Sequence, residues 1–184
     1  MIESFYQKPF PILPLDEHYY LREQSLDDTE DFYRYYSRPE VGRHIFAARP
    51  TNSFEAESEI YYCRNLFRSQ RGIYWSIAEK ASNKMVGAIG LYINNFHHRA
   101  EISYDLAPEY WRHGIMTKAL QTVTQYAFNE IGLDRVEAVT VKENVASIQL
   151  LLKCGYLYEG TLRNYKRFEE KPRDVEMYAC VKNA

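Results

Sequence analysis

The sequence predicts an α/β fold, with a single mixed, mostly antiparallel twisted sheet flanked by helices. Three consecutive strand-like segments, joined by short turns that contain Ser and Asn, predict an antiparallel meander. A helical period then leads into a valine-rich strand, which adds a β-α-β unit. The expected order is β-α-α-β-β-β-α-β-α-β-β. No repeat or Pro/Gly/Ser linker interrupts it, so we expect one domain over residues 1–184.

Composition and charge narrow the class of protein. The 184 residues are 46% hydrophobic and 26% charged, as in ordinary folded domains, and the net charge of −2 gives no general footprint for nucleic acid. Three scattered cysteines are too few for a disulfide framework and are typical of reduced thiols. Neither a signal peptide nor a membrane span is evident, so we expect a cytoplasmic protein without a membrane partner.

The first third of the chain predicts an arm, a strand and two helices. Residues 1–16 are rich in proline and indicate an extended arm on the surface. A strand is expected over 19–24. The acidic segment 26–31 would lie at the positive end of a helix, which Pro39 and Gly42 should end. A second helix is expected over 54–69, and its apolar positions share one face: Ile60, Cys63 and Phe67.

The remainder predicts the meander, two helices and three further strands. Helical spacing over 116–131 ends at Gly132, and a short helix capped by Asn144 ends at Gly155. In the short helix three side chains should face inward: Ile148, Leu151 and Leu152. The expected strands are 73–79, 84–92, 99–106, 135–141, 156–165 and 174–181.

The turn between Leu106 and Thr117 carries the clearest chemical signal. A strand ends, Pro108 turns the chain, and a helix opens at Gly114. Backbone N–H groups at the start of a helix, beside a glycine that permits close approach, suit phosphate oxygens. Arg112 and Thr117 could add a charge and a hydroxyl donor. A single glycine can equally ease a tight turn, so the residues alone leave both interpretations open.

Several short segments together resemble the GNAT superfamily of acetyl-CoA-dependent N-acetyltransferases, specifically its RimJ/RimL-like branch. The segments are Glu101–Leu106, the turn and helix after it, Asn144–Ser147, Lys153–Tyr156 and Glu159–Arg163. The resemblance implies the acyl-CoA N-acyltransferase fold, with acetyl-CoA as co-substrate and no metal. It also implies a set of cofactor-binding residues: Leu106, Trp111, Arg112, His113, Gly114, Ile115, Met116, Thr117 and Asn144.

The same resemblance implies two catalytic residues. Glu101 matches the general base of histone-type relatives, and Ser147 matches a serine implicated in Rim-like enzymes. Acetyl transfer requires removal of a proton from the amine and stabilisation of the oxyanion and the thiolate. Two of the expected catalytic positions depart from the family: Leu151 replaces a tyrosine acid, and Lys166 replaces a glutamate. In the turn, Trp111 and Met116 depart from the general loop pattern of the superfamily. The alternatives are that Glu101 is a solvated strand residue, that Ser147 is a packing residue, and that Asn144 serves only as a helix cap.

The implied function is transfer of an acetyl group from acetyl-CoA to a primary amine. The closest resemblance implies a protein N-terminal amine of ribosomal-protein type. Small-molecule amines (amino acids, polyamines or antibiotics) and a non-catalytic coenzyme A sensor are the alternatives. We expect the acceptor to contact residues 38–50 and the basic segment 163–173, in a monomer or homodimer. His97 and His98 lie in a hairpin loop without metal-ligand spacing, and Cys154 is interpreted as a core residue.

Overall fold

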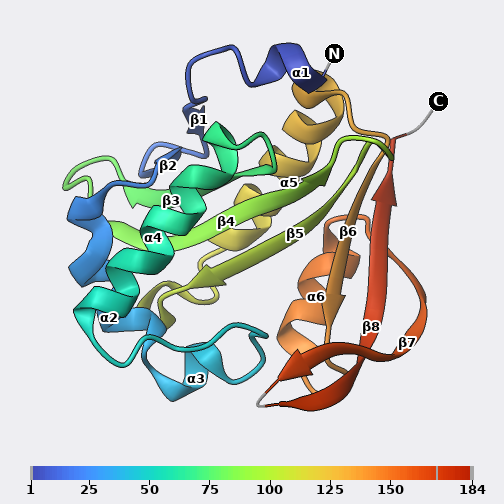
Figure 1. The fold of residues 1–184 in the computed structure, drawn as a ribbon. Coiled ribbons are helices and arrows are strands. Elements are labelled where there is room, and N and C mark those ends of the chain that lie inside the picture. The colour runs from blue at the N-terminus through green and yellow to red at the C-terminus, as the bar shows by residue number, and fades with distance from the viewer. Residues whose placement is uncertain (1, 169, 183–184) are drawn as a thin grey trace.

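One eight-stranded sheet organises the molecule, in the order β1-β2-β3-β4-β5-β6-β8-β7 (Figure 1). The computed structural model describes residues 2–168 and 170–182. Neighbouring strands are antiparallel except for β5 and β6, which are parallel. The strands are β1 (Leu13–Pro14), β2 (Tyr19–Glu23), β3 (Gly72–Glu79), β4 (Met85–Asn94), β5 (Arg99–Leu106), β6 (Arg135–Thr140), β7 (Leu157–Phe168) and β8 (Lys171–Val181). The predicted mixed, mostly antiparallel sheet is confirmed.

Helices cover both faces of this sheet (Figure 1). They are α1 (Ile2–Phe5), α2 (Thr29–Tyr36), α3 (Pro39–Gly42), α4 (Ser53–Arg68), α5 (Ile115–Tyr126) and α6 (Val145–Lys153). Side chains of a strand alternate between its faces. Trp75 therefore packs in a core with α1, α5 and α6, whereas Tyr74 joins a second core with α2 and α4.

The N-terminal segment is not simply an extended surface arm. Residues Ile2–Phe5 form the helix α1, and Phe5 is only 2% exposed. Its ring contacts those of Phe67 and Tyr126, while the Pro11 carbonyl accepts a hydrogen bond from the Trp75 indole at 2.9 Å. Burial of these apolar side chains anchors the segment to the core, which proline content did not indicate.

Two local expectations differ from the structure. Although α2 ends at Tyr36, before Pro39, Pro39 itself begins the further short helix α3, because proline is well tolerated at the first helical position. Leu152 does not face inward: it is 51% exposed, while Leu151 is fully buried. The expected helix over 116–131 forms and stops at Gly132, and its last residues, Ala127–Ile131, form a π-helical turn. None of the described helices is long and apolar enough to cross a membrane.

Candidate active site

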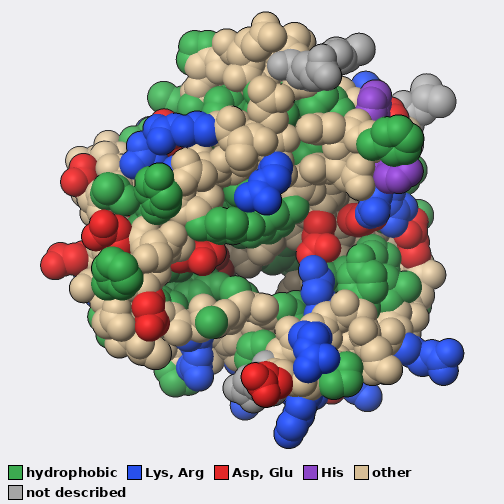
Figure 2. Space-filling view, viewed as in Figure 1, with side chains coloured by type: hydrophobic (Ala, Val, Ile, Leu, Met, Phe, Trp, Pro, Cys, Tyr) green, Lys and Arg blue, Asp and Glu red, His purple; other side chains and the backbone are tan. Residues whose placement is uncertain are grey.

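The parallel strands β5 and β6 separate partway along the sheet. β5 pairs with β4 along its whole length, but with β6 only from Arg99 to Glu101. The Ala107 N–H donates to the Val86 carbonyl, so the backbone groups of Ala107 point toward β4. The direction alternates along a strand. The backbone N–H and C=O groups of Ile102, Tyr104 and Leu106 therefore point away from β4. Figure 2 shows an opening through this part of the molecule. A ligand there could bind the unpaired edge of β5.

The turn after β5 presents backbone donors at the start of α5. Gly114 has a φ of +77° and lies immediately before the helix, whose first N–H groups lack intrahelical acceptors. A Cβ added at position 114 would meet no other atom within 4 Å, so the approach to these donors is open. Residues 111–114 are exposed. This geometry suits phosphate oxygens, which is one of the two interpretations that the residues alone left open.

Two predicted cofactor residues already have partners within the chain. The Leu106 carbonyl accepts a hydrogen bond from the Trp111 indole at 2.7 Å. Asn144 Oδ1 accepts from the backbone N–H of Ser147 at 3.2 Å, so Asn144 caps α6. A carbonyl oxygen has a second lone pair, and the Asn144 amide nitrogen is a separate donor. Both residues therefore retain groups that could contact a ligand.

The predicted catalytic residues lie on opposite faces of β5. Glu101 shares a face with Asp105, next to α2, whereas Ser147 Oγ lies 2.8 Å from the hydroxyl of Tyr104 on the other face. Glu101 Oε1 accepts a hydrogen bond from Lys166 Nζ at 2.7 Å. Both members of that ion pair are partly exposed. The fold thus brings Lys166 to Glu101 and Tyr104 to Ser147, but leaves Glu101 and Ser147 without mutual contact.

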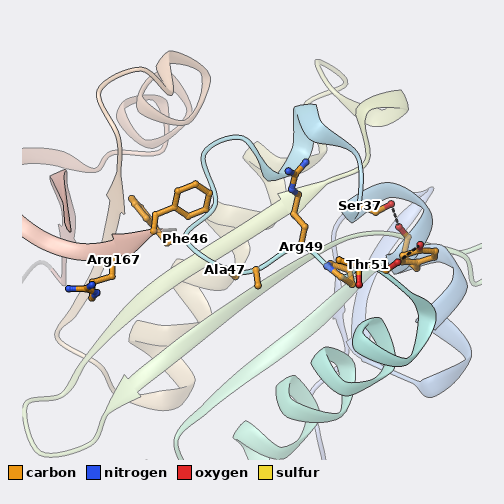
Figure 3. A pocket seen from close by; sticks show the side chains of 10 residues that line it. Ser37, Phe46, Ala47, Arg49, Thr51 and Arg167 are labelled. Atoms are coloured by element: carbon orange, nitrogen blue, oxygen red, sulfur yellow. Dashed lines mark hydrogen bonds between the residues drawn. The ribbon is translucent and has the colours of Figure 1, made fainter. Parts of the chain in front are cut away.

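A cavity of about 630 Å³ lies on the α2 side of the sheet. It is formed by the end of α2, the loop before α4 and the tip of the β7–β8 hairpin (Figure 3). The lining residues are Tyr33, Ser37, Phe46, Ala47, Ala48, Arg49, Pro50, Thr51, Arg167 and Phe168. This set joins the two segments expected to contact the acceptor, 38–50 and 163–173. Arg167 also follows Lys166, the partner of Glu101.

The stem of Arg49 passes close to Gly42. A Cβ at position 42 would lie 2.3 Å from Arg49 Cδ, so a larger residue there would require the arginine stem to move. Figure 3 shows Ala47 and Arg49 on the loop between Phe46 and Thr51. Among the residues that the structure describes, the lining carries two guanidinium groups, of Arg49 and Arg167, and no carboxylate.

Asp105 is a buried acid that sequence reasoning did not single out. Tyr35 donates a 2.6 Å hydrogen bond to Asp105 Oδ1. Burial raises the pKa of Asp105 from its ordinary 3.8 to about 7, and the Tyr35 bond only partly opposes that shift. Glu59, which is nearby, also has a pKa raised by burial. These groups lie under α2 and α4, away from the opening beside α6.

Other sequence candidates do not assemble into a site. Within residues 2–168 and 170–182, no three His, Cys, Asp or Glu side chains are arranged to hold a metal ion. His98 lies 3.7 Å from Asp134 on the surface. Cys154 is half-buried, and burial raises the pKa of its thiol, which keeps it protonated.

The sequence missed Tyr104 and the partnership of Glu101 with Lys166. Tyr104 lies inside the segment Glu101–Leu106 that carried the resemblance. The period of two along a strand places Tyr104 on the face opposite Glu101. Nothing in the sequence, however, indicates that α6 would bring Ser147 to that face, because the contact joins residues 43 positions apart.

Comparison with known proteins places these features in context. Residues 18–157 match the family model described as an acetyltransferase (GNAT) domain. The N-acetyltransferase YoaA of Bacillus subtilis is 36% identical over 174 residues, which cover 94% of this chain and 98% of that protein. Spermidine N(1)-acetyltransferase of Escherichia coli is 34% identical over 70 residues, 38% of each chain.

Solved structures show the same fold. RimL, a ribosomal L7/L12 alpha-N-protein acetyltransferase solved with coenzyme A, superposes with a TM-score of 0.84 at 18% identity, over 93% of this chain and 98% of that one. The microcin C7 self-immunity acetyltransferase MccE, solved with acetyl-CoA and AMP, has a TM-score of 0.81 at 20% identity, over 91% and 94% of the two chains.

Proposed function

Because the chain belongs to the GNAT acetyltransferase family and is an acetyl-CoA-dependent N-acetyltransferase, we propose that its acceptor is the α-amine of a protein N terminus. The carrying observation is the open cavity of about 630 Å³, which has room for an extended peptide end. Its lining residue Arg167 follows Lys166, the partner of Glu101, along β7. The likeness to RimL, which is described as an alpha-N-protein acetyltransferase, supports the same acceptor class.

In this proposal acetyl-CoA enters the opening between β5 and β6. Its amide-containing arm would bond to backbone groups of Ile102, Tyr104 and Leu106 that face away from β4. Its diphosphate would receive N–H donors from Ile115, Met116 and Thr117, next to Arg112. Trp111, His113 and Asn144 would complete the contacts at the two ends of this opening.

The acceptor amine would approach from the α2 side, where Glu101 lies. Oε1 of Glu101 is engaged by Lys166, while Oε2 has no protein donor in the described part of the chain. Oε2 would accept the amine proton, directly or through water, as the nitrogen attacks the thioester carbonyl. Ser147, on the opposite face, would stabilise the sulfur as it leaves.

A polyamine is the second candidate acceptor, because the spermidine acetyltransferase of Escherichia coli is a relative over 70 residues. The cavity lining argues against it. Arg49 and Arg167 would repel a polycation, and the described lining residues include no carboxylate that would attract one. We therefore favour the amine of a peptide N terminus over a polyamine as the acceptor.

Release of coenzyme A thiol, measured across a matched panel of amines, tests the acceptor. The panel contains a peptide that begins with Ser and includes a Lys, and the same peptide with its N terminus blocked, which leaves the Lys side chain as its only free amine. It also contains spermidine and free amino acids. We expect the largest kcat/KM for the free N terminus and at most background release for the blocked peptide. Faster turnover of spermidine or of an amino acid would overturn the peptide assignment.

A further inference from the structure

A hydrogen bond crosses from β5 to α6 over the stretch where β5 has lost its partner β6. Tyr104 lies three residues beyond Glu101, the last β5 residue paired with β6. Its hydroxyl is 2.8 Å from Oγ of Ser147, in the first turn of α6. The Ser147 backbone N–H is held separately by Asn144. The backbone and the side chain of Ser147 are therefore each fixed by one neighbour.

We propose that Tyr104 is a positioning residue for Ser147: its phenol donates to Ser147 Oγ, which leaves the Ser147 hydroxyl proton available to the sulfur of the departing thiolate. The proposal rests on the proposed function, because it requires acetyl-CoA in the opening between β5 and β6. It concerns only the leaving group, and is therefore independent of which amine is the acceptor.

A second tyrosine–hydroxyl pair in the same core shows why the direction of donation matters. Tyr156 and Thr124 are 2.7 Å apart and both are buried, but Thr124 Oγ1 also donates to the Leu120 carbonyl at 2.7 Å. The Thr124 proton is thus used inside its own helix, and Tyr156 must be the donor. Ser147 Oγ has no further protein partner in the described chain. When Tyr104 donates to Ser147 Oγ, the Ser147 hydroxyl proton therefore has no acceptor within the protein.

The chemistry of the two hydroxyls supports this direction. A phenol is a stronger acid than an aliphatic alcohol and is therefore the better donor to it. Burial raises the pKa of Tyr104 above its ordinary value of 10, so the phenol keeps its proton at neutral pH. Tyr104 and Ser147 then form a chain of two hydrogen bonds that ends at the sulfur, in which each bond strengthens the other.

No proton leaves the protein in this step. The nitrogen lone pair forms the C–N bond, the C–S bond breaks, and its electron pair stays on sulfur. The sulfur anion accepts the hydrogen bond of Ser147 and later takes a proton from water. The nitrogen loses its proton to Glu101 or water. Tyr104 and Ser147 therefore stabilise developing charge without being ionised themselves.

Single-turnover acetyl transfer at saturating acetyl-CoA tests the proposal, with the fastest amine of the panel as acceptor. We expect Tyr104→Phe to slow transfer about tenfold and Ser147→Ala about ten- to hundredfold. Adding Tyr104→Phe to Ser147→Ala should cause no further loss, because the two groups act in one chain. Coenzyme A affinity should change little in all three variants. Because any reactive amine serves, a wrong acceptor assignment leaves this test intact.

The matched control is Tyr156→Phe, which removes a phenol–hydroxyl bond of the same kind from the core. It should lower the melting temperature about as much as Tyr104→Phe does, but leave the transfer rate within about twofold of the parent rate. A similar loss of rate in both variants would mean that Tyr104 acts only through folding.

An isosteric pair at position 147 keeps the proposal falsifiable if Tyr104→Phe folds poorly. Ser147→Thr keeps the hydroxyl and should retain most of the rate, whereas Ser147→Val, of the same shape, should lose it. Equal rates for these two variants, a parent-like rate for Tyr104→Phe, or additive losses in the double variant would each overturn the proposal.

Discussion

At the scale of single residues, Gly114 has both a structural and a functional role at the start of α5. Its φ of +77° is costly for most residues, so a glycine is favoured by the backbone alone. The open space around it and the unpaired N–H groups that follow provide the second, functional reason.

Gly114→Asp and Gly114→Asn separate these two reasons. Asn and Asp are nearly the same size and are the non-glycine residues that best tolerate positive φ. Only Asp adds a negative charge beside the expected diphosphate. We expect calorimetry to show acetyl-CoA affinity reduced on the order of a hundredfold for Asp, and much less for Asn. Equal affinities in two folded variants would contradict the phosphate site at this turn.

The pair of Glu101 and Lys166 gives a second test at this scale. If Glu101 accepts the amine proton, Glu101→Gln should lower kcat by about two to four orders of magnitude, with little change in acetyl-CoA affinity. The control is Lys166→Met, which removes the 2.7 Å ion pair but keeps the carboxylate. It should retain most of the activity. An active Glu101→Gln enzyme would assign the proton to water or another group.

At the scale of elements, α2 is held to β5 by a buried polar contact as well as by its apolar face. Phe32, Tyr35 and Tyr36 are buried, and the Tyr35 hydroxyl reaches Asp105 across the packed layer. A buried carboxyl that cannot easily ionise makes this packing dependent on pH. The acceptor cavity depends on the same helix, because Tyr33 and Ser37 at its end line that cavity.

The stability of the fold should therefore fall as Asp105 ionises. Its pKa is raised from 3.8 to about 7, so the folded state binds this proton more tightly than the unfolded chain. The favourable contribution is complete below about pH 4 and is lost as the pH rises through 7. Urea midpoints measured against pH should show this loss in the parent protein and not in Asp105→Asn.

Tyr35→Phe provides a second control for the same measurement, because it should shift the pH dependence rather than abolish it. The Tyr35 hydrogen bond favours the ionised carboxyl, so its removal should move the loss of stability to higher pH. An Asp105→Asn protein with the same pH dependence as the parent would show that Asp105 is not the responsible group.

At the scale of the whole molecule, the acceptor cavity is built by segments that are far apart in sequence. The loop before α4 and the β7–β8 hairpin meet only because the strand order places β7 at one edge of the sheet. The hairpin segment 163–173 has five basic and two acidic residues, although the whole chain has a net charge of −2. Figure 2 shows Lys and Arg side chains gathered near the hairpin tip.

This charge distribution predicts a preference for peptides with acidic residues after the N-terminal amine. For Ser-Asp-Asp and Ser-Lys-Lys peptides of equal length, we expect kcat/KM to favour the acidic one by roughly three- to tenfold at low salt. The preference should shrink as salt is added. Arg49→Gln and Arg167→Gln should each reduce it.

Arg68→Gln is the control for that comparison. It removes the same charge from the last turn of α4, whereas the loop that lines the cavity precedes the first turn. Sixteen helical residues span roughly 24 Å, well beyond the screening distance at physiological salt. A preference for the basic peptide, or equal effects of the three variants, would contradict an electrostatic role for the cavity lining.

The sequence by itself determined the order of the main elements and the type of sheet. Strand period, turn residues and helix stops are local signals, and they predicted the meander, α5, β6 and α6. The resemblance of short segments likewise identified the family, because their order along the chain is a property of sequence. The same local signals missed α1, whose four residues are stabilised by contacts with Phe67 and Tyr126.

Only the tertiary structure decided which side chains meet. The opening exists because β6 leaves β5 after Glu101 and pairs instead with β8, and α6 brings Ser147 against the unpaired part of β5. Lys166 reaches Glu101 across 65 positions, and the cavity joins loops more than 100 residues apart. Such contacts depend on how the elements pack over long separations, for which local propensity and spacing carry no signal.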